Sequence, residues 1–129
     1  MVAKMNTNGT LYTRYTDNPG YWGGLVSQQI AGNNTNFFVF DMSGNLRMAI
    51  APDGQTITDT LAYDAFGDTQ YHNGSTSLSL RFAAQVGGFQ DSAIPSMVYL
   101  RNRIMWSIIQ RFASRDPIGP RGGMSVNPW

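Results

Sequence analysis

The feature of this sequence that most restricts its fold is the regular return of turn residues between short extended segments. Clear turn signals are Asp17-Asn18-Pro19-Gly20, Pro52-Asp53-Gly54 and Asn73-Gly74, because these residue types supply the backbone angles that tight turns need. Turns recur about every 8–12 residues, a spacing typical of all-β proteins. Glu is absent and Lys4 is the only lysine, so good surface-helix formers are scarce. We therefore predict an all-β fold of successive antiparallel hairpins.

The register of several strands is visible as an alternation of apolar residues with other residues. Leu46, Met48 and Ile50 alternate with Arg47 and Ala49, which predicts one buried and one exposed face because side chains alternate along a strand. Similar alternation predicts strands at residues 10–16, 56–63, 78–82 and 98–106, residues 25–31 form a further probable strand, and a continuous apolar run predicts one at 36–41. A helix over residues 105–113 is the minor alternative for the end of this series.

Composition limits the classes of partner and compartment. The 129 residues suffice for one domain with a modest core. Charged residues make up 13% of the chain, against about 25% in globular proteins, so copies of the chain repel one another weakly. The net charge of +1 does not by itself indicate an acidic partner. No apolar run approaches the ~18 residues of a membrane helix, and we expect neither membrane insertion nor a signal peptide.

Several motifs occur in an order that resembles one known family. They are YWGGLVSQ at 21–28, YDAFG at 63–67, RFAAQVGGFQD at 81–91, YLRNR at 99–103 and QRFASRDPIG at 110–119. Together they resemble the Rhs (YD-repeat) family, and more closely its C-terminal repeat-associated core domain. The residues that carry this resemblance as a structural motif are Tyr63, Asp64, Gly67, Tyr99, Arg101, Arg103, Arg111, Phe112, Pro117 and Gly119.

The resemblance implies a spiralling sheet of hairpins that walls a cavity, and a secreted or cell-surface location. We expect residues 10–119 to form this β module, with 1–9 as an N-terminal arm and 120–129 as a C-terminal loop or arm. The match weakens where Trp106 and Ser107 replace an Asp-Pro pair and Gln110 replaces a turn glycine. We therefore expect the usual turn to be lost there and an apolar extended stretch to take its place.

Asp116 is the sharpest candidate for catalysis. Pro117 disfavours a helical conformation at Asp116, and Gly119 permits a positive φ, so the carboxylate is expected at a rigid bend beside Arg115. The resemblance implies an aspartyl autoprotease whose second DPxG motif supplies the other carboxylate. This chain ends at Trp129 without that motif. We expect Asp116 to be a turn residue paired with an arginine, and the chain alone to lack enzymatic activity.

A group of arginines lies near Trp106 and Phe112, an arrangement that binds single-stranded nucleic acid in other proteins. Its members are Arg101, Arg103, Arg111, Arg115 and Arg121. The near-neutral charge favours pairing with Asp91 and Asp116 instead, so we expect no nucleic-acid partner. His72, the only histidine, is predicted to be a solvated turn residue. Because a zinc site needs several His or Cys ligands, we expect no metal and no cofactor.

Two apolar segments, residues 37–40 and 104–109, are low in charge and free of proline, and such segments tend to pair with other chains. The candidate residues for self-association are Phe37, Phe38, Phe40, Trp106 and Ile108. An ordinary β core is the alternative for these segments. We predict a structural module whose partners are other copies of itself, in an extracellular fibre or oligomer. The alternative function is a fragment of the autoproteolytic shell of a secreted polymorphic toxin of the Rhs type.

Overall fold

The computed structural model describes residues 2–5, 7–18, 24–33, 35–91, 93–100 and 103–114. This part of the chain is all-β, as predicted, with eleven strands and one short 3-10 helix. The elements are β1 (Val2–Met5), β2 (Leu11–Asp17), β3 (Leu25–Ile30), β4 (Thr35–Phe40), β5 (Leu46–Ile50), β6 (Ile57–Tyr63), β7 (Thr69–Asn73), η1 (Ala84–Val86), β8 (Gly88–Asp91), β9 (Ile94–Leu100), β10 (Arg103–Trp106) and β11 (Arg111–Phe112).

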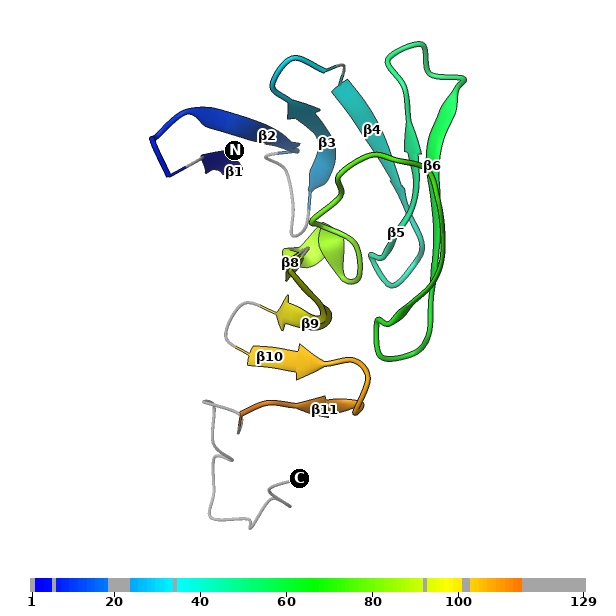
Figure 1. Cartoon of the computed structure of the whole chain (residues 1–129). Coiled ribbons are helices and arrows are strands. Elements are labelled where there is room, and N and C mark those ends of the chain that lie inside the picture. The colour runs from blue at the N-terminus through cyan, green and yellow to red at the C-terminus, as the bar shows by residue number, and fades with distance from the viewer. Residues whose placement is uncertain are drawn as a thin grey trace.

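The strands form two open antiparallel sheets rather than one continuous sheet. The larger sheet has seven strands in the order β1 to β7, and the smaller has the order β11-β10-β9-β8. Each strand pairs with its neighbours in sequence, so the sheets are series of hairpins. Figure 1 shows the large sheet curving around the segment after β7, with β9, β10 and β11 stacked below. Neither sheet closes on itself, so each ends in two edge strands.

Two turns of the large sheet have the same construction. The carboxylate oxygen Oδ1 of Asp41 accepts hydrogen bonds from the backbone N–H of Ser43 and of Asn45, both at 3.0 Å. In the same way Oδ1 of Asp64 accepts from the N–H of Phe66 and of Asp68, at 2.8 and 2.9 Å. The third residue after each aspartate is a glycine, Gly44 or Gly67, and its φ is positive. Residues with a Cβ rarely adopt this conformation. These two aspartates therefore act as local hydrogen-bond acceptors within their turns.

The core lies where the concave side of the large sheet meets the segment after β7. It consists of Tyr15, Leu25, Leu46, Leu61, Leu78 and Ala84, with Phe38, Phe40, Tyr63 and Leu80 packed against it. The sequence predicted a strand at 78–82, and this is wrong, because the segment forms no strand. It is held as an irregular loop by backbone bonds across the sheet, such as Leu46 N–H to the Arg81 carbonyl at 2.8 Å. Its leucines still face inward.

The predicted alternation in β5 is also wrong. Leu46 and Ala49, three positions apart, are both fully buried, whereas a regular strand would bury Leu46 and Met48 together. The pairing with β4 skips Arg47, since Phe40 lies opposite Leu46 and Val39 lies opposite Met48. This β-bulge reverses the faces of the residues that follow it. The hydrophobicity of the sequence does not reveal this bulge, because either Ala49 or Met48 could be buried in a core.

The first residues differ from the arm that the sequence predicted. Val2–Met5 is a strand that pairs with β2 at the edge of the large sheet. The ammonium group of Lys4 donates a hydrogen bond to the Ser79 hydroxyl at 2.7 Å and lies 5.0 Å from the ring centre of Phe89. This single lysine therefore ties the edge strand to the loop after β7 and to β8.

The segment predicted as one strand over 98–106 is divided between two antiparallel strands. Ile104 of β10 lies opposite Tyr99 of β9, and the two connecting residues lie outside the described ranges. The turn expected to be lost after Trp106 is present: residues 107–110 connect β10 to β11, which excludes the alternative of a helix. Gln110, which replaces the glycine of the family motif, has φ of 57°. The turn is therefore present although Gln110, a residue with a Cβ, has to adopt the left-handed conformation.

We expect Gln110→Gly to stabilise the chain. A left-handed conformation costs a residue with a Cβ about 1–2 kcal/mol, and the flexibility of glycine in the unfolded chain offsets part of the gain. The free energy of unfolding should therefore rise by about 0.5–1 kcal/mol, measured by urea denaturation. The matched control is Ile109→Gly, at an exposed neighbour without a positive φ, which should destabilise. Equal effects of both substitutions would contradict this account.

Candidate functional site

The predicted catalytic residues cannot be placed. Asp116, Arg115, Pro117 and Gly119 lie outside the described residues, as do Arg101 and Arg121 of the predicted arginine cluster. Of that cluster the structure describes Arg103 and Arg111, both on the last hairpin. The guanidinium carbon of Arg103 lies 3.4 Å from the ring centre of Phe112, a cation–π contact. In the described part of the chain no three His, Cys, Asp or Glu side chains come together as a metal site would require.

The YDAFG motif builds a turn that anchors the loop after β7. The Tyr63 ring meets the Phe82 ring edge-on with centres 6.0 Å apart. Gly67 lies directly against Phe82, and a Cβ there would approach the ring to 2.6 Å. Burial raises the pKa of the Tyr63 hydroxyl, which has no hydrogen-bond partner among the described atoms. Tyr63, Asp64 and Gly67 are therefore packing and turn residues, as a structural motif requires.

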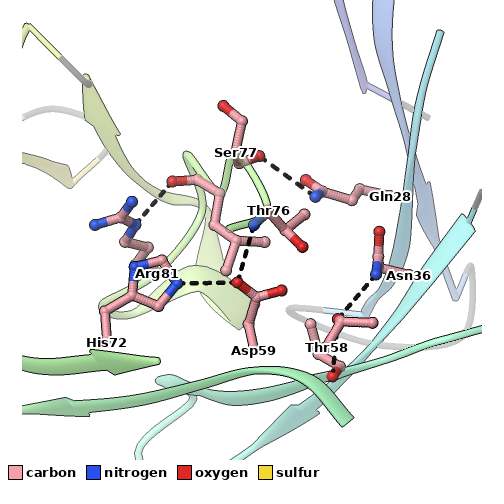
Figure 2. Close-up of polar contacts among 10 residues, drawn as sticks. Gln28, Asn36, Thr58, Asp59, His72, Thr76, Ser77 and Arg81 are labelled. Carbon is pink, nitrogen blue, oxygen red and sulfur yellow. Dashed lines mark hydrogen bonds and ion pairs between the residues drawn. The ribbon is translucent and has the colours of Figure 1, made fainter. Parts of the chain in front are cut away.

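The strongest group of polar contacts centres on Asp59, in the middle of β6. Its side chain is fully buried, and Oδ1 lies 3.0 Å from Nε2 of His72 on β7 and 3.1 Å from the backbone N of Thr76. Since a carboxylate only accepts hydrogen bonds, the proton lies on Nε2 of the histidine. Figure 2 shows both bonds ending on the same carboxylate oxygen, the one from His72 at the left and the one from Thr76 above. Asp59 therefore connects two strands to the loop that follows them.

The surroundings of Asp59 favour its ionised form. Burial raises the pKa of this carboxyl, but the hydrogen bonds from Thr76 and His72 outweigh burial and hold the pKa below its ordinary value. The other oxygen, Oδ2, has no hydrogen-bond partner of good geometry within the described residues. A second buried polar contact lies nearby in Figure 2, where the Asn36 amide donates to the Thr58 hydroxyl at 3.0 Å.

Gly74 makes the close approach of Asp59 possible. Its φ is +139°, and a Cβ at this position would lie 2.2 Å from Asp59 Oδ1 and 2.6 Å from the Thr58 carbonyl oxygen. The Asn73-Gly74 pair, which the sequence identified only as a hairpin signal, thus opens the space into which the carboxylate fits.

A carboxylate that orients an imidazole is also a component of acid–base sites. Here no hydrogen bond is formed between the imidazole of His72 and a hydroxyl nucleophile of the described chain, and the side chain is 22% exposed. The arrangement fits a structural role, in which Asp59 holds the loop of residues 74–77 on the sheet.

The prediction that His72 is a solvated turn residue is wrong, because it lies in β7 and binds a buried carboxylate. The sequence did contain one signal: Asp59 stands among apolar residues in the alternation of residues 57–63.

The outer face of β4–β7 is the largest feature that the polar centre does not explain. Residues directly opposite each other on neighbouring strands project to the same face, and the register pairs Phe37 with Ile50 and Ile50 with Ile57. We call the side turned away from the core the outer face. Its members are Phe37, Val39, Met48, Ile50, Ile57, Thr60, Ala62, Tyr71 and Asn73. None of these paired residues is charged, and Arg47, at the bulge of β5, has no partner in the register. The exposed side of an antiparallel sheet is usually polar.

The predicted association residues of β4 divide between the core and this outer face. Phe38 and Phe40 pack against the core with their rings edge-on at 6.1 Å, so they are not on the surface that would meet a partner. Phe37 is 42% exposed, and Ile57 and Tyr71 are more than half exposed. The alternation of β4 therefore separates one apolar run into core residues and surface residues.

The hairpin formed by β10 and β11 carries a second apolar surface, which we call the hairpin patch. It consists of Trp106, Ile108 and Ile109, and Ile108 is the most exposed at 67%. Phe112 lies opposite Met105 whereas Trp106 lies opposite Arg111, so Phe112 projects to the other face of the hairpin. Trp106 and Ile108 were predicted to associate, and both are on the surface. The turn that presents them is fixed by Ser107, which is buried and bonded through its N–H and its hydroxyl to the Ser96 carbonyl, at 2.8 and 3.0 Å.

No model of a known protein family matches the chain, and no curated protein matches it. Among the described residues there is no helix long and apolar enough to cross a membrane.

Proposed function

We propose that this chain is a structural β module that assembles with copies of itself, as a fibre or oligomer outside the cell. The observation that carries this proposal is the uncharged outer face of β4–β7, centred on Phe37, Ile50 and Ile57. Contiguous apolar surface of this kind is uncommon on monomeric proteins and marks contact sites. The extracellular location comes from the resemblance to secreted YD-repeat proteins.

Other copies of the chain are a suitable partner for physical reasons. Charged residues make up only 13% of the sequence and the net charge is +1, so approach of two copies meets little electrostatic repulsion. The buried polar centre and the repeated aspartate turns have no group arranged for a reaction. A structural role accounts for these features together, whereas an enzymatic role leaves the outer face unexplained.

A second candidate function is a fragment of the shell of an Rhs-type toxin. The repeated turns at Asp41 and Asp64 favour it, because they recur in successive hairpins of an open sheet, as in a longer array of YD repeats. In that case other strands of the shell would continue the sheet and cover the outer face. Autoproteolysis and the release of an effector would belong to that longer protein.

Electron microscopy and light scattering of the purified chain at low micromolar concentration test the proposal. We expect the wild type to form filaments or large oligomers, and Phe37→Asp to abolish them, because a charge would be buried in the contact. Met42→Asp is the matched control, since Met42 is a fully exposed apolar residue in a turn, and it should assemble normally. Circular dichroism confirms that each variant folds. A monomeric wild type contradicts self-assembly, and filaments of Phe37→Asp contradict the role of the outer face.

A further inference from the structure

We infer that the hairpin patch of one copy docks on the outer face of β4–β7 of the next copy. This inference rests on the proposed self-assembly and names the two surfaces that meet. The two surfaces lie on different sheets of the chain (Figure 1), and the exposure of Phe37 and Ile108 shows that neither is covered within one copy.

The hairpin patch is built as a rigid apolar projection. Its turn is anchored through buried Ser107 to β9, and Ala113 N–H bonds the Ile104 carbonyl at 2.7 Å beyond the turn. Ile108 and Ile109 therefore extend from a fixed backbone, and little conformational freedom is lost on docking. Anchors of this kind, apolar and preorganised, carry most of the binding energy of protein interfaces.

Charge decides which surface the patch meets. Arg111 lies opposite Trp106 and so on the same face of the hairpin. Two hairpin patches packed on each other would bring this charge and its copy together, which is unfavourable. The outer face has no charged member, and the exposed carboxylate of Asp53 stands in the turn between β5 and β6, next to the Ile50–Ile57 pair. The positive charge of Arg111 beside the hairpin patch is thus complementary to the carboxylate of Asp53 beside the outer face.

The geometry of such a contact has a consequence for the assembly. When two different surfaces of identical chains meet, every copy leaves one surface of each kind free for the next. The assembly therefore grows head to tail and stays open unless the rotation between copies closes a ring. This predicts filaments or rings rather than an isolated two-fold dimer.

Complementation between two variants tests the inference. Phe37→Asp blocks the outer face and keeps the hairpin patch, whereas Ile108→Asp blocks the hairpin patch and keeps the outer face. We expect each variant alone to be monomeric in size-exclusion chromatography with light scattering. An equimolar mixture should form a dimer of twice the chain mass and no filaments, because each heterodimer has only its two blocked surfaces left. Circular dichroism checks the fold of both variants.

The other outcomes separate this inference from the proposed function. If both variants form dimers alone and mixing changes nothing, each surface pairs with itself, so the inference is wrong while self-assembly stands. If Ile108→Asp still forms filaments, the inference is likewise wrong, and self-assembly again stands. A wild-type chain that stays monomeric at these concentrations overturns both the inference and the proposed function.

Discussion

Replacing Gly74 by alanine is expected to destabilise the chain strongly. The new Cβ would lie 2.2 Å from Asp59 Oδ1 and 2.6 Å from the Thr58 carbonyl oxygen, in a backbone with φ of +139°. The carboxylate cannot withdraw without losing its bonds to His72 and Thr76. We expect a loss of about 4 kcal/mol, a large part of the roughly 5–15 kcal/mol that stabilises a typical domain.

Gly32 is the matched control for this substitution. Its φ is +77°, yet nothing lies within 4 Å of the position that a Cβ would take. Gly32→Ala should therefore cost only the backbone strain, about 1–2 kcal/mol. Urea denaturation at low protein concentration measures both variants. If Gly74→Ala is no more destabilising than Gly32→Ala, the loop of residues 74–77 yields easily and Asp59 does not hold it.

The second large effect is expected at Asp59 itself. Asp59→Ala removes the acceptor for the His72 ring and the Thr76 N–H and leaves these donors without their partner. The loss should be about 3 kcal/mol, because hydrogen bonds to a charged group contribute about 1.5–3 kcal/mol each. Asp59→Asn should cost less, since its amide oxygen can still accept both bonds at the position of Oδ1.

The contribution of Asp59 also depends on pH in a defined direction. Its pKa is lowered in the folded state, so folding favours the ionised form. The stabilisation is therefore fully present above the unfolded value of about 4 and is lost as the pH falls through the lowered folded value. The difference in unfolding free energy between the wild type and Asp59→Asn should shrink from pH 7 to pH 3. A constant difference over this range would show that the charge of Asp59 does not stabilise the fold.

These two predictions connect the polar centre with the proposed assembly. Asp59 and Gly74 hold the loop of residues 74–77 on β6 and β7, and both strands contribute to the outer face. A chain in which this loop detaches would lose the register that places Ile57 and Tyr71 on one surface. The free energy of unfolding of the Asp59 and Gly74 variants should therefore be measured before these variants are used in an assembly experiment.

Local patterns predicted most of the strands because strand formation and turn formation depend on neighbours in sequence. The strand predicted over 56–63 forms over Ile57–Tyr63, one residue shorter. The turns at Asp41 and Asp64 each contain an aspartate with a glycine three positions later. The predicted strand at 78–82 failed because the same leucines satisfy a buried loop equally well. Trp106 and Ile108 were identified as surface candidates, whereas Phe38 and Phe40 were not distinguished from Phe37.

By itself, the sequence determined that this protein is a series of antiparallel hairpins with a low surface charge, because turn chemistry and alternation act over a few residues. Only the tertiary structure decided which apolar residues are buried. The bulge at Arg47 reverses the face of Ala49, and the pairing of β6 with β7 brings Asp59 to His72. Both depend on strand register, which is set by contacts between residues distant in sequence. The division of the surface into an outer face and a hairpin patch follows from that register.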